Sequence, residues 1–142
     1  MKFQLVAVGK LKEAGLRDLC DDYCRRIIRY APFTEREVKD DAALRKAVPV
    51  EGVVVALQVT GKALSSTQFA KQIEKWRDGG TSQLTFVIGG AEGIPRDVDE
   101  RAGLRLSLSS LTLPHRLARL LLLEQIYRAF SILNNEPYAR ED

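Results

Sequence analysis

Residues 84–93 read LTFVIGGAEG, a mostly apolar run followed by three glycines in five residues. Such a run is typical of a buried strand in a parallel sheet, so we predict a strand over Leu84–Ile88 and a turn after it. The GGxxG spacing is not that of the common phosphate-binding loops, and Glu92 would repel a phosphate there. The turn is therefore either a plain tight turn or a place where backbone approaches a planar ligand closely.

Similar strands alternate with helical patterns on both sides of this stretch. The other expected strands are Phe3–Val8, Phe33–Val38, Gly52–Leu57 and Leu104–Leu108. The expected helices are Leu16–Tyr30, Asp41–Val48, a helix from Ser65 to Gly79-Gly80, Pro95–Ala102, and His115 to about Asn134. Ser65 and Gln68 form a capping-box pattern at the start of the third helix. The alternation predicts a single α/β domain over residues 1–142, built around a mostly parallel sheet.

Composition narrows the class of protein. The chain has 142 residues, of which 45% are hydrophobic and 29% charged, with a net charge of +3. These values exclude collagen-like, disordered and disulfide-stapled classes. Apolar runs such as Leu120–Leu123 are far shorter than the roughly 20 residues that span a bilayer. The N-terminus lacks the features of a signal peptide. We expect a cytoplasmic enzyme or binding domain with no membrane partner.

Cysteine and histidine are too few for a metal centre. Cys20 and Cys24 share one helix face, but no second cysteine pair exists and His115 is the one histidine. A structural zinc site needs four ligands, so we expect no metal and interpret both cysteines as small core residues in a reducing compartment.

The last expected helix is apolar nearly all round. Leucine, isoleucine, tyrosine and phenylalanine occupy so many of its positions that they cannot all face one sheet. Such a helix is either enclosed in the core or packed on both the sheet and a partner. A domain of this size has little room for a fully enclosed helix, so we expect a homodimer.

Positive charge is concentrated in the first third of the chain. The residues that could form one basic face there are Lys10, Lys12, Arg25, Arg26 and Arg29. Such a face would attract phosphates, and a dimer would double it. The alternative is a solvated helix surface.

Three expected strand ends carry unusual sequence. They are Gln58–Lys62, Gly89–Gly93 and Ser107–His115, which supply small residues, hydroxyls and free backbone groups. Ligands of parallel α/β sheets bind beyond the carboxyl ends of strands, so these three segments predict a shared crevice. The backbone of Leu108–Leu113 could read a purine edge while its leucines cover the ring. The alternative is an ordinary strand that runs into a helix.

A resemblance to a known family rests on an ordered set of motifs along the whole chain. These are KFQLVAVGK, GKALSS, FVIGGAEG, LSLSSLTLPHRLAR, EQIYRAFSI and the terminal PYARE. Together they resemble the bacterial 23S ribosomal RNA (pseudouridine-N3)-methyltransferases of the SPOUT superfamily. The resemblance implies a SPOUT-type α/β knot with a C-terminal trefoil, a homodimer, and S-adenosyl-L-methionine bound in the knot.

The resemblance also implies site residues and a substrate. Position by position, the cofactor contacts fall on Leu57, Gly89, Leu108, Ser109, Ser110, Leu111, Thr112 and Leu113. The implied activity is methyl transfer to N3 of a pseudouridine in 23S ribosomal RNA, recognised within the ribosome. The sulfonium already activates the methyl group, so the protein has mainly to align the acceptor nitrogen and assist its deprotonation.

The sequence departs from the family at the residue that could serve as the base. Members commonly end in Pro-Tyr-His-Arg, whereas this chain has Ala139 in the place of the histidine. The candidates for a catalytic role are then Glu136, Tyr138 and Arg140, with solvent as a further possible base and His115 as a residue of catalytic or structural role. Gln58 stands where relatives often carry Asp, which weakens any polar contact expected there.

Arginines and an aromatic residue are candidates for holding the RNA. Arg119, Arg128 and Arg140 could bind its phosphates or position the tail, and the alternative for each is an ion-pair residue at the surface or an interface. Tyr138 could stack on the target base.

Two other functions fit parts of this pattern. The loss of the histidine at Ala139 suits a non-catalytic module that binds RNA or the ribosome and keeps the knotted fold. A small flavodoxin-like nucleotide-binding domain is the third, although no phosphate-cradling loop supports it.

Overall fold

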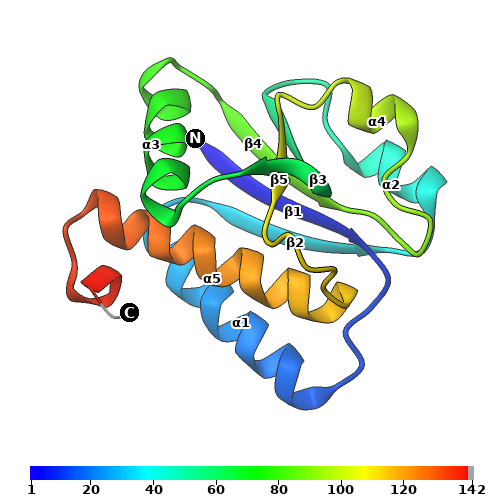
Figure 1. The fold of residues 1–142 in the computed structure, drawn as a ribbon, viewed down its shortest axis with the longest axis horizontal. Coiled ribbons are helices and arrows are strands. Elements are labelled where there is room, and N and C mark those ends of the chain that lie inside the picture. The colour runs from blue at the N-terminus through cyan, green and yellow to red at the C-terminus, as the bar shows by residue number, and fades with distance from the viewer. Residues whose placement is uncertain (141–142) are drawn as a thin grey trace.

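A computed structural model of the chain, which describes residues 1–140, has a five-stranded sheet at its centre (Figure 1). The strands lie in the order β2-β1-β4-β3-β5, and every neighbouring pair is parallel. Their bounds are β1 Lys2–Val8, β2 Phe33–Val38, β3 Val53–Ala63, β4 Gln83–Ile88 and β5 Leu104–Ser107. The parallel α/β architecture predicted from the alternating pattern is therefore confirmed.

Helices cover both faces of the sheet. Their bounds are α1 Ala14–Ile28, α2 Asp41–Ala47, α3 Ser66–Asp78, α4 Arg96–Glu100 and α5 His115–Leu133, followed by the short 3₁₀ helix η1 Pro137–Arg140. Buried residues of α1, α3 and α5 belong to one hydrophobic cluster, and those of α2 and α4 belong to another. Figure 1 shows α1 and α5 side by side, with α2 and α4 grouped across the sheet from them.

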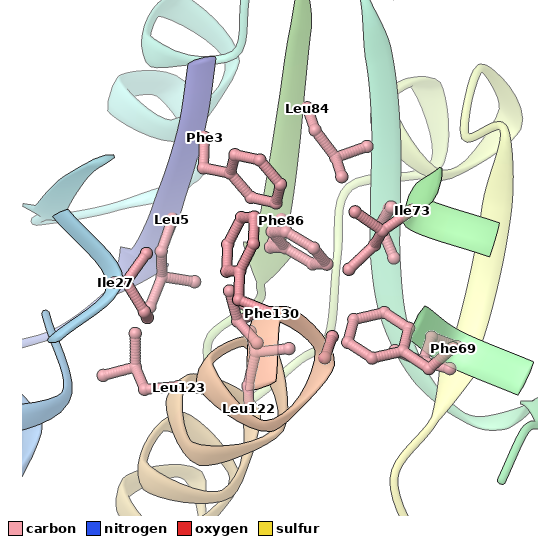
Figure 2. Close-up of a cluster of buried hydrophobic side chains, with 14 of the residues drawn as sticks. Phe3, Leu5, Ile27, Phe69, Ile73, Leu84, Phe86, Leu122, Leu123 and Phe130 are labelled. Carbon is pink, nitrogen blue, oxygen red and sulfur yellow. The ribbon is translucent and has the colours of Figure 1, made fainter. Parts of the chain in front are cut away.

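The two clusters follow from the two-residue period of the strands. Phe3 and Leu5 of β1 and Phe86 of β4 point into the larger cluster, whereas Val6 and Val87 point into the smaller one. Figure 2 shows the larger cluster, in which Phe3 and Phe86 of the sheet meet side chains of α1, α3 and α5. Alternate residues of the central strands are thus buried on both faces, as their nearly continuous apolar sequences predict.

The strand predicted over Gly52–Leu57 was placed too short. β3 continues to Ala63, and its pairing with β5 shifts so that both Leu57 and Lys62 lie opposite Leu106. The four residues between them are left out of the ladder. A Cβ on Gly61 would lie 2.7 Å from the Arg105 backbone, so a glycine lets β3 return to β5. The helix predicted over Pro95–Ala102 is also shorter, because α4 ends at Glu100.

The capping box at the start of α3 is confirmed and gives a testable stability prediction. Ser65 Oγ accepts a hydrogen bond from the Gln68 amide at 3.1 Å, and Gln68 Oε1 accepts one from the Ser65 amide at 2.8 Å. We expect Ser65→Ala to lower the free energy of unfolding by about 1 kcal/mol in urea denaturation. Thr67→Ala, at an exposed position in the same helical turn, is the control and should cost less.

Part of the apolar surface of α5 remains exposed. Leu122, Leu123 and Ile126 are fully buried under the sheet, whereas Leu117 and Leu121 are 37% and 41% exposed. These two leucines are four residues apart and therefore share one side of the helix. The homodimer and the trefoil knot remain predictions. No helix within residues 1–140 is long and apolar enough to cross a membrane.

Candidate functional site

A cavity of about 710 Å³ opens where the carboxyl ends of four strands meet. It is lined from β1, β3, β4 and the segments that follow β4 and β5, so the three strand ends singled out in the sequence do share one crevice. Seven of the eight predicted cofactor contacts line it: Leu57, Gly89, Leu108, Ser109, Leu111, Thr112 and Leu113. Ser110 is not among the lining residues that the structure describes. The size falls within the range of pockets that bind small molecules.

The glycine turn forms one wall because its backbone packs without side chains. A Cβ on Gly89 would lie 2.4 Å from the Gly93 carbonyl carbon and 2.6 Å from the Ile94 nitrogen. The turn is closed by a hydrogen bond from the Gly93 amide to the Gly90 carbonyl at 3.0 Å, and Gly93 has a φ of +85°. These contacts explain the glycines at both ends of the turn. No phosphate needs to be bound there to account for them.

The segment after β5 forms another wall of the cavity, and it is a loop. β5 ends at Ser107 and α5 begins at His115, so residues 108–114 belong to neither element. Local hydrogen bonds hold the loop: Ser107 Oγ donates to the Ser109 carbonyl and the Leu111 amide donates to Ser109 Oγ, both at 2.9 Å. Of the two alternatives left open by the sequence, a strand that runs directly into a helix does not describe residues 108–114. The loop exposes backbone groups and leucines to the cavity.

Sequence reasoning missed a fourth strand end and the residue Ala118 of α5, whereas it included His115 in the third segment. Val8 and Gly9 at the end of β1 line the cavity, as do His115 and Ala118 of α5. The strand-end rule that selected the other three segments applies equally to β1 and could have found Gly9. The sequence there, Gly-Lys-Leu-Lys, lacks the hydroxyls that drew attention elsewhere.

His115 lies at the cavity wall, and its pKa is lowered from the usual value. Burial lowers its pKa, and the positive charge of Arg119 lowers it further, while hydrogen bonding to the Gly89 backbone opposes both effects. Its Nε2 atom is buried without a hydrogen-bond partner within residues 1–140. His115 therefore connects the start of α5 to the glycine turn.

Arg119 was a candidate for binding RNA phosphate, and the structure contradicts that role. The side chain is 0% exposed. Its Nη1 atom forms an ion pair with Glu37 and lies 3.5 Å from Glu35, and Nη2 donates to the Gly9 carbonyl at 3.0 Å. The physical reason is that β2 presents two carboxylates to this face of α5, which compensate a buried charge. Arg119 therefore supports the cavity wall from the protein interior, because it binds the carbonyl of Gly9, a lining residue.

The same carboxylates are shared with α1. Arg17 pairs with Glu35 and lies 3.3 Å from Glu37, and Glu37 accepts a hydrogen bond from the Leu11 amide at 2.9 Å. This ion-pair network, formed by Arg17, Glu35, Glu37 and Arg119, thus connects α1, β2, α5 and the segment that follows β1.

The network predicts a pH dependence of stability. Burial raises the pKa of Glu37, but the Leu11 amide and the positive charges of Arg119 and Arg17 outweigh it, so the net pKa is lowered. A lowered folded-state pKa contributes stability above the unfolded value of about 4.3 that is lost as pH falls further. We expect the stability advantage of the wild type over Glu37→Gln to be constant near neutrality and to shrink below about pH 4.3. Urea denaturation across that range measures it, and a constant difference would contradict the assignment.

The C-terminal candidates lie away from the cavity in the same chain. Tyr138 OH donates to Glu124 at 2.7 Å and is 3.1 Å from Tyr23 OH, so burial and these partners raise its pKa. Glu136 accepts from Tyr30 OH at 2.6 Å, and Arg140 Nη2 lies 3.5 Å from the Asn135 carbonyl. None of the three lines the cavity. Their predicted catalytic roles remain untested.

Arg128, another candidate for RNA contact, is partnered within the chain. It lies 2.9 Å from Glu124, and its guanidinium stacks over the Tyr138 ring at 4.9 Å from the centroid.

Gln58, which lines the cavity, donates a hydrogen bond to Asp99 at 3.0 Å. This bond connects the segment after Leu57 to α4.

Both cysteines are free thiols. Burial, with a smaller contribution from Glu35, raises the pKa of Cys20 to about 11 and that of Cys24 to about 12. This agrees with the interpretation of both as inert packing residues. Within residues 1–140 no three His, Cys, Asp or Glu side chains gather as a metal site.

Comparisons with known proteins identify close relatives. Residues 1–139 match a family model described as "Predicted SPOUT methyltransferase". The chain is 44% identical to the ribosomal RNA large subunit methyltransferase H of Sorangium cellulosum, over 98% of this chain and 99% of that protein. It is 43% identical to the protein of the same name from Carboxydothermus hydrogenoformans, over 97% and 99%.

Solved structures share the fold at much lower identity. A probable methylase family protein from Haemophilus influenzae Rd KW20 superposes with a TM-score of 0.59 at 11% identity, covering 94% of this chain and 68% of that one. TrmJ from Z. mobilis ZM4 gives a TM-score of 0.53 at 13% identity, covering 91% and 70%.

Proposed function

Because the chain belongs to the SPOUT methyltransferase family, we propose that it methylates N3 of a pseudouridine in the 23S ribosomal RNA of the large subunit. The observation that carries the proposal is the cavity at the strand ends, which gathers seven of the eight residues expected to contact S-adenosylmethionine. The names of the relatives, with coverage of nearly their whole length, support ribosomal RNA as the substrate. The proposal takes residues 1–142 as one methyltransferase domain that acts in the cytoplasm.

The cavity suits the cofactor in size and in chemistry. Leucines and isoleucines supply apolar surface for the faces of an adenine ring. The loop over residues 108–114 and the glycine turn supply backbone donors and acceptors for its edge. When bound, S-adenosylmethionine supplies a sulfonium whose methyl group is already activated for transfer.

The chain's own part in the reaction is orientation. Leu57, Gly89 and Leu111 come from three separate wall segments, so the cavity can hold a ligand on several sides and fix where a methyl group points. The acceptor N3 must also lose its proton. Glu136 of the same chain is bonded to Tyr30 and Tyr138 to Glu124, and neither lines the cavity, so a role of the tail in this step requires a neighbouring protomer.

We include a homodimer in the proposal, formed through the exposed leucines of α5. Leu121→Glu places a charge on this apolar side, and we expect it to yield monomers with reduced methyl transfer, measured by light scattering and activity. Val50→Glu is the control, because Val50 is also apolar and is 91% exposed in the loop between α2 and β3. An unchanged dimer in Leu121→Glu would rule out this side of α5 as the interface.

Transfer of labelled methyl groups tests the activity directly. Purified protein should move label from S-adenosylmethionine to ribosomes of cells that lack the protein, and mass spectrometry should locate it on a pseudouridine. Ribosomes from cells that contain the protein are the control and should accept none. Cofactor binding with no transfer to any ribosomal substrate would favour the non-catalytic module, which Ala139 motivates.

A further inference from the structure

Two exposed lysines follow the end of β1, the strand whose last residues line the cavity. Gly9 lines the cavity, and Lys10 and Lys12 follow it with exposed side chains. No ion pair within residues 1–140 involves either of them. The nearest acidic residue in sequence, Glu13, lies 3.7 Å from Arg116. We call Lys10 and Lys12 the basic rim.

The backbone that carries the basic rim is fixed to the body of the protein. The Gly9 amide donates to the Val38 carbonyl at 2.8 Å, and the Gly9 carbonyl accepts from Arg119 at 3.0 Å. The Leu11 amide donates to Glu37 at 2.9 Å, and the Leu11 side chain packs against the larger hydrophobic cluster. The two lysines therefore extend from an ordered segment, and a ligand that binds them need not order the backbone first.

Their surroundings set them apart from other cations of the chain. Lys39, which follows β2 at the same edge of the sheet, is succeeded by Asp40 and Asp41. Those carboxylates reduce the positive potential at Lys39. By contrast, Glu13, which follows Lys12, is paired with Arg116, and Glu37, which accepts from the Leu11 amide, is paired with Arg17 and Arg119. A net positive charge thus remains beside the cavity mouth.

We propose that Lys10 and Lys12 bind backbone phosphates of the RNA strand next to the nucleotide that enters the cavity. The inference rests on the proposed function and adds the contact that sets the register of the RNA. Lysine ammonium groups bind phosphates as point charges, and contacts of this kind position a nucleic acid without reading its sequence. Figure 1 shows the segment after β1 on the same side as the start of α5, with α3 on the other side.

A matched pair of double variants tests the basic rim. K10Q/K12Q removes its two charges. K71Q/K75Q removes two charges from exposed positions one turn apart on α3, so both variants change the net charge equally. Binding to large ribosomal subunits is measured across a salt series, together with cofactor affinity and the KM and kcat of methyl transfer.

We expect K10Q/K12Q to reduce the slope of log affinity against log salt by about two, one for each phosphate that the variant no longer neutralises. KM for ribosomal particles should rise at least about fivefold, with kcat at saturation and cofactor affinity changed less than twofold. K71Q/K75Q should change none of these quantities by more than twofold.

Equal effects of the two double variants, or no effect of either, would overturn the basic rim. A failure of the proposed function looks different: the wild type would transfer no methyl group, while the salt series still reports whether Lys10 and Lys12 contact RNA. If wild-type binding does not depend on salt, the basic rim is also ruled out.

Discussion

Arg119→Met should lower the free energy of unfolding by roughly 3–5 kcal/mol, the largest stability effect that we expect for a single substitution in this chain. Arg119 is fully buried and faces Glu37, Glu35 and the Gly9 carbonyl. Methionine keeps much of the volume of the stem but leaves the partly buried carboxylates with Arg17 as their nearest charged partner. The loss in the free energy of unfolding comes mainly from carboxylates that are left buried without a compensating charge, and less from the lost attraction between Arg119 and Glu37.

Arg45→Met is the matched control for this measurement. Arg45 also forms an ion pair, 3.0 Å from Asp97, but its side chain is 50% exposed and that of Asp97 is 62% exposed. Exposed ion pairs contribute about 0–1 kcal/mol, so the control should be nearly neutral. Urea denaturation of both variants at neutral pH gives the comparison. Similar destabilisation of the two variants would show that burial of Arg119 does not govern its contribution.

Gly89→Ala should reduce methyl transfer by roughly 100-fold, the largest effect on activity that we expect from adding one methyl group. The added Cβ would lie 2.4 Å from the Gly93 carbonyl carbon and 2.5 Å from its oxygen. Both atoms belong to the backbone, so the added methyl group displaces the turn itself. The cavity wall then moves relative to the loop over residues 108–114, and the methyl donor is no longer aligned with its acceptor.

Gly90→Ala provides the control at the neighbouring position. Its Cβ would meet a side-chain methyl of Val8 at 3.1 Å, a contact that a small movement relieves. Both glycines line the cavity, so the two variants differ mainly in whether the new methyl group meets backbone. We expect Gly90→Ala to keep activity within a few-fold of the wild type. Cofactor affinity and the free energy of unfolding, measured on both, separate a displaced wall from a general loss of stability. Equal activities in the two variants would contradict the expected role of Gly89.

The strands and helices could be predicted well from the sequence because their signals are local. The strand Phe33–Val38 has the bounds predicted for it, and the capping box at Ser65 and Gln68 forms as expected. β3 was misjudged because its polar extension pairs with β5, which lies about 45 residues later in the chain. A strand whose extension depends on a distant partner carries no complete local signal.

The candidate site was predicted in part. Leu57, Gly89 and the loop over residues 108–114 line one cavity because carboxyl ends of parallel strands meet at one edge. Gly9 was not placed there, because the end of the strand Phe3–Val8 was not among the strand ends that the argument selected. Ala118 was missed because it lies beyond the selected segment, which ends at His115. For Arg119 the sequence left open RNA binding or an ion pair, and the ion pair is confirmed, but nothing near Arg119 in the sequence indicates that its partners are Glu35 and Glu37.

The sequence by itself therefore determined the α/β alternation, the parallel sheet and three of the segments around the cavity. Periodicity and helix caps act over a few residues, so a linear reading detects them. Only the tertiary structure decided that Arg119 is buried, that β3 returns to β5, and that Gly9 lines the cavity. Each of these depends on contacts between residues far apart in the chain, such as Arg119 with Glu37, whose free energy exists only once the sheet has assembled.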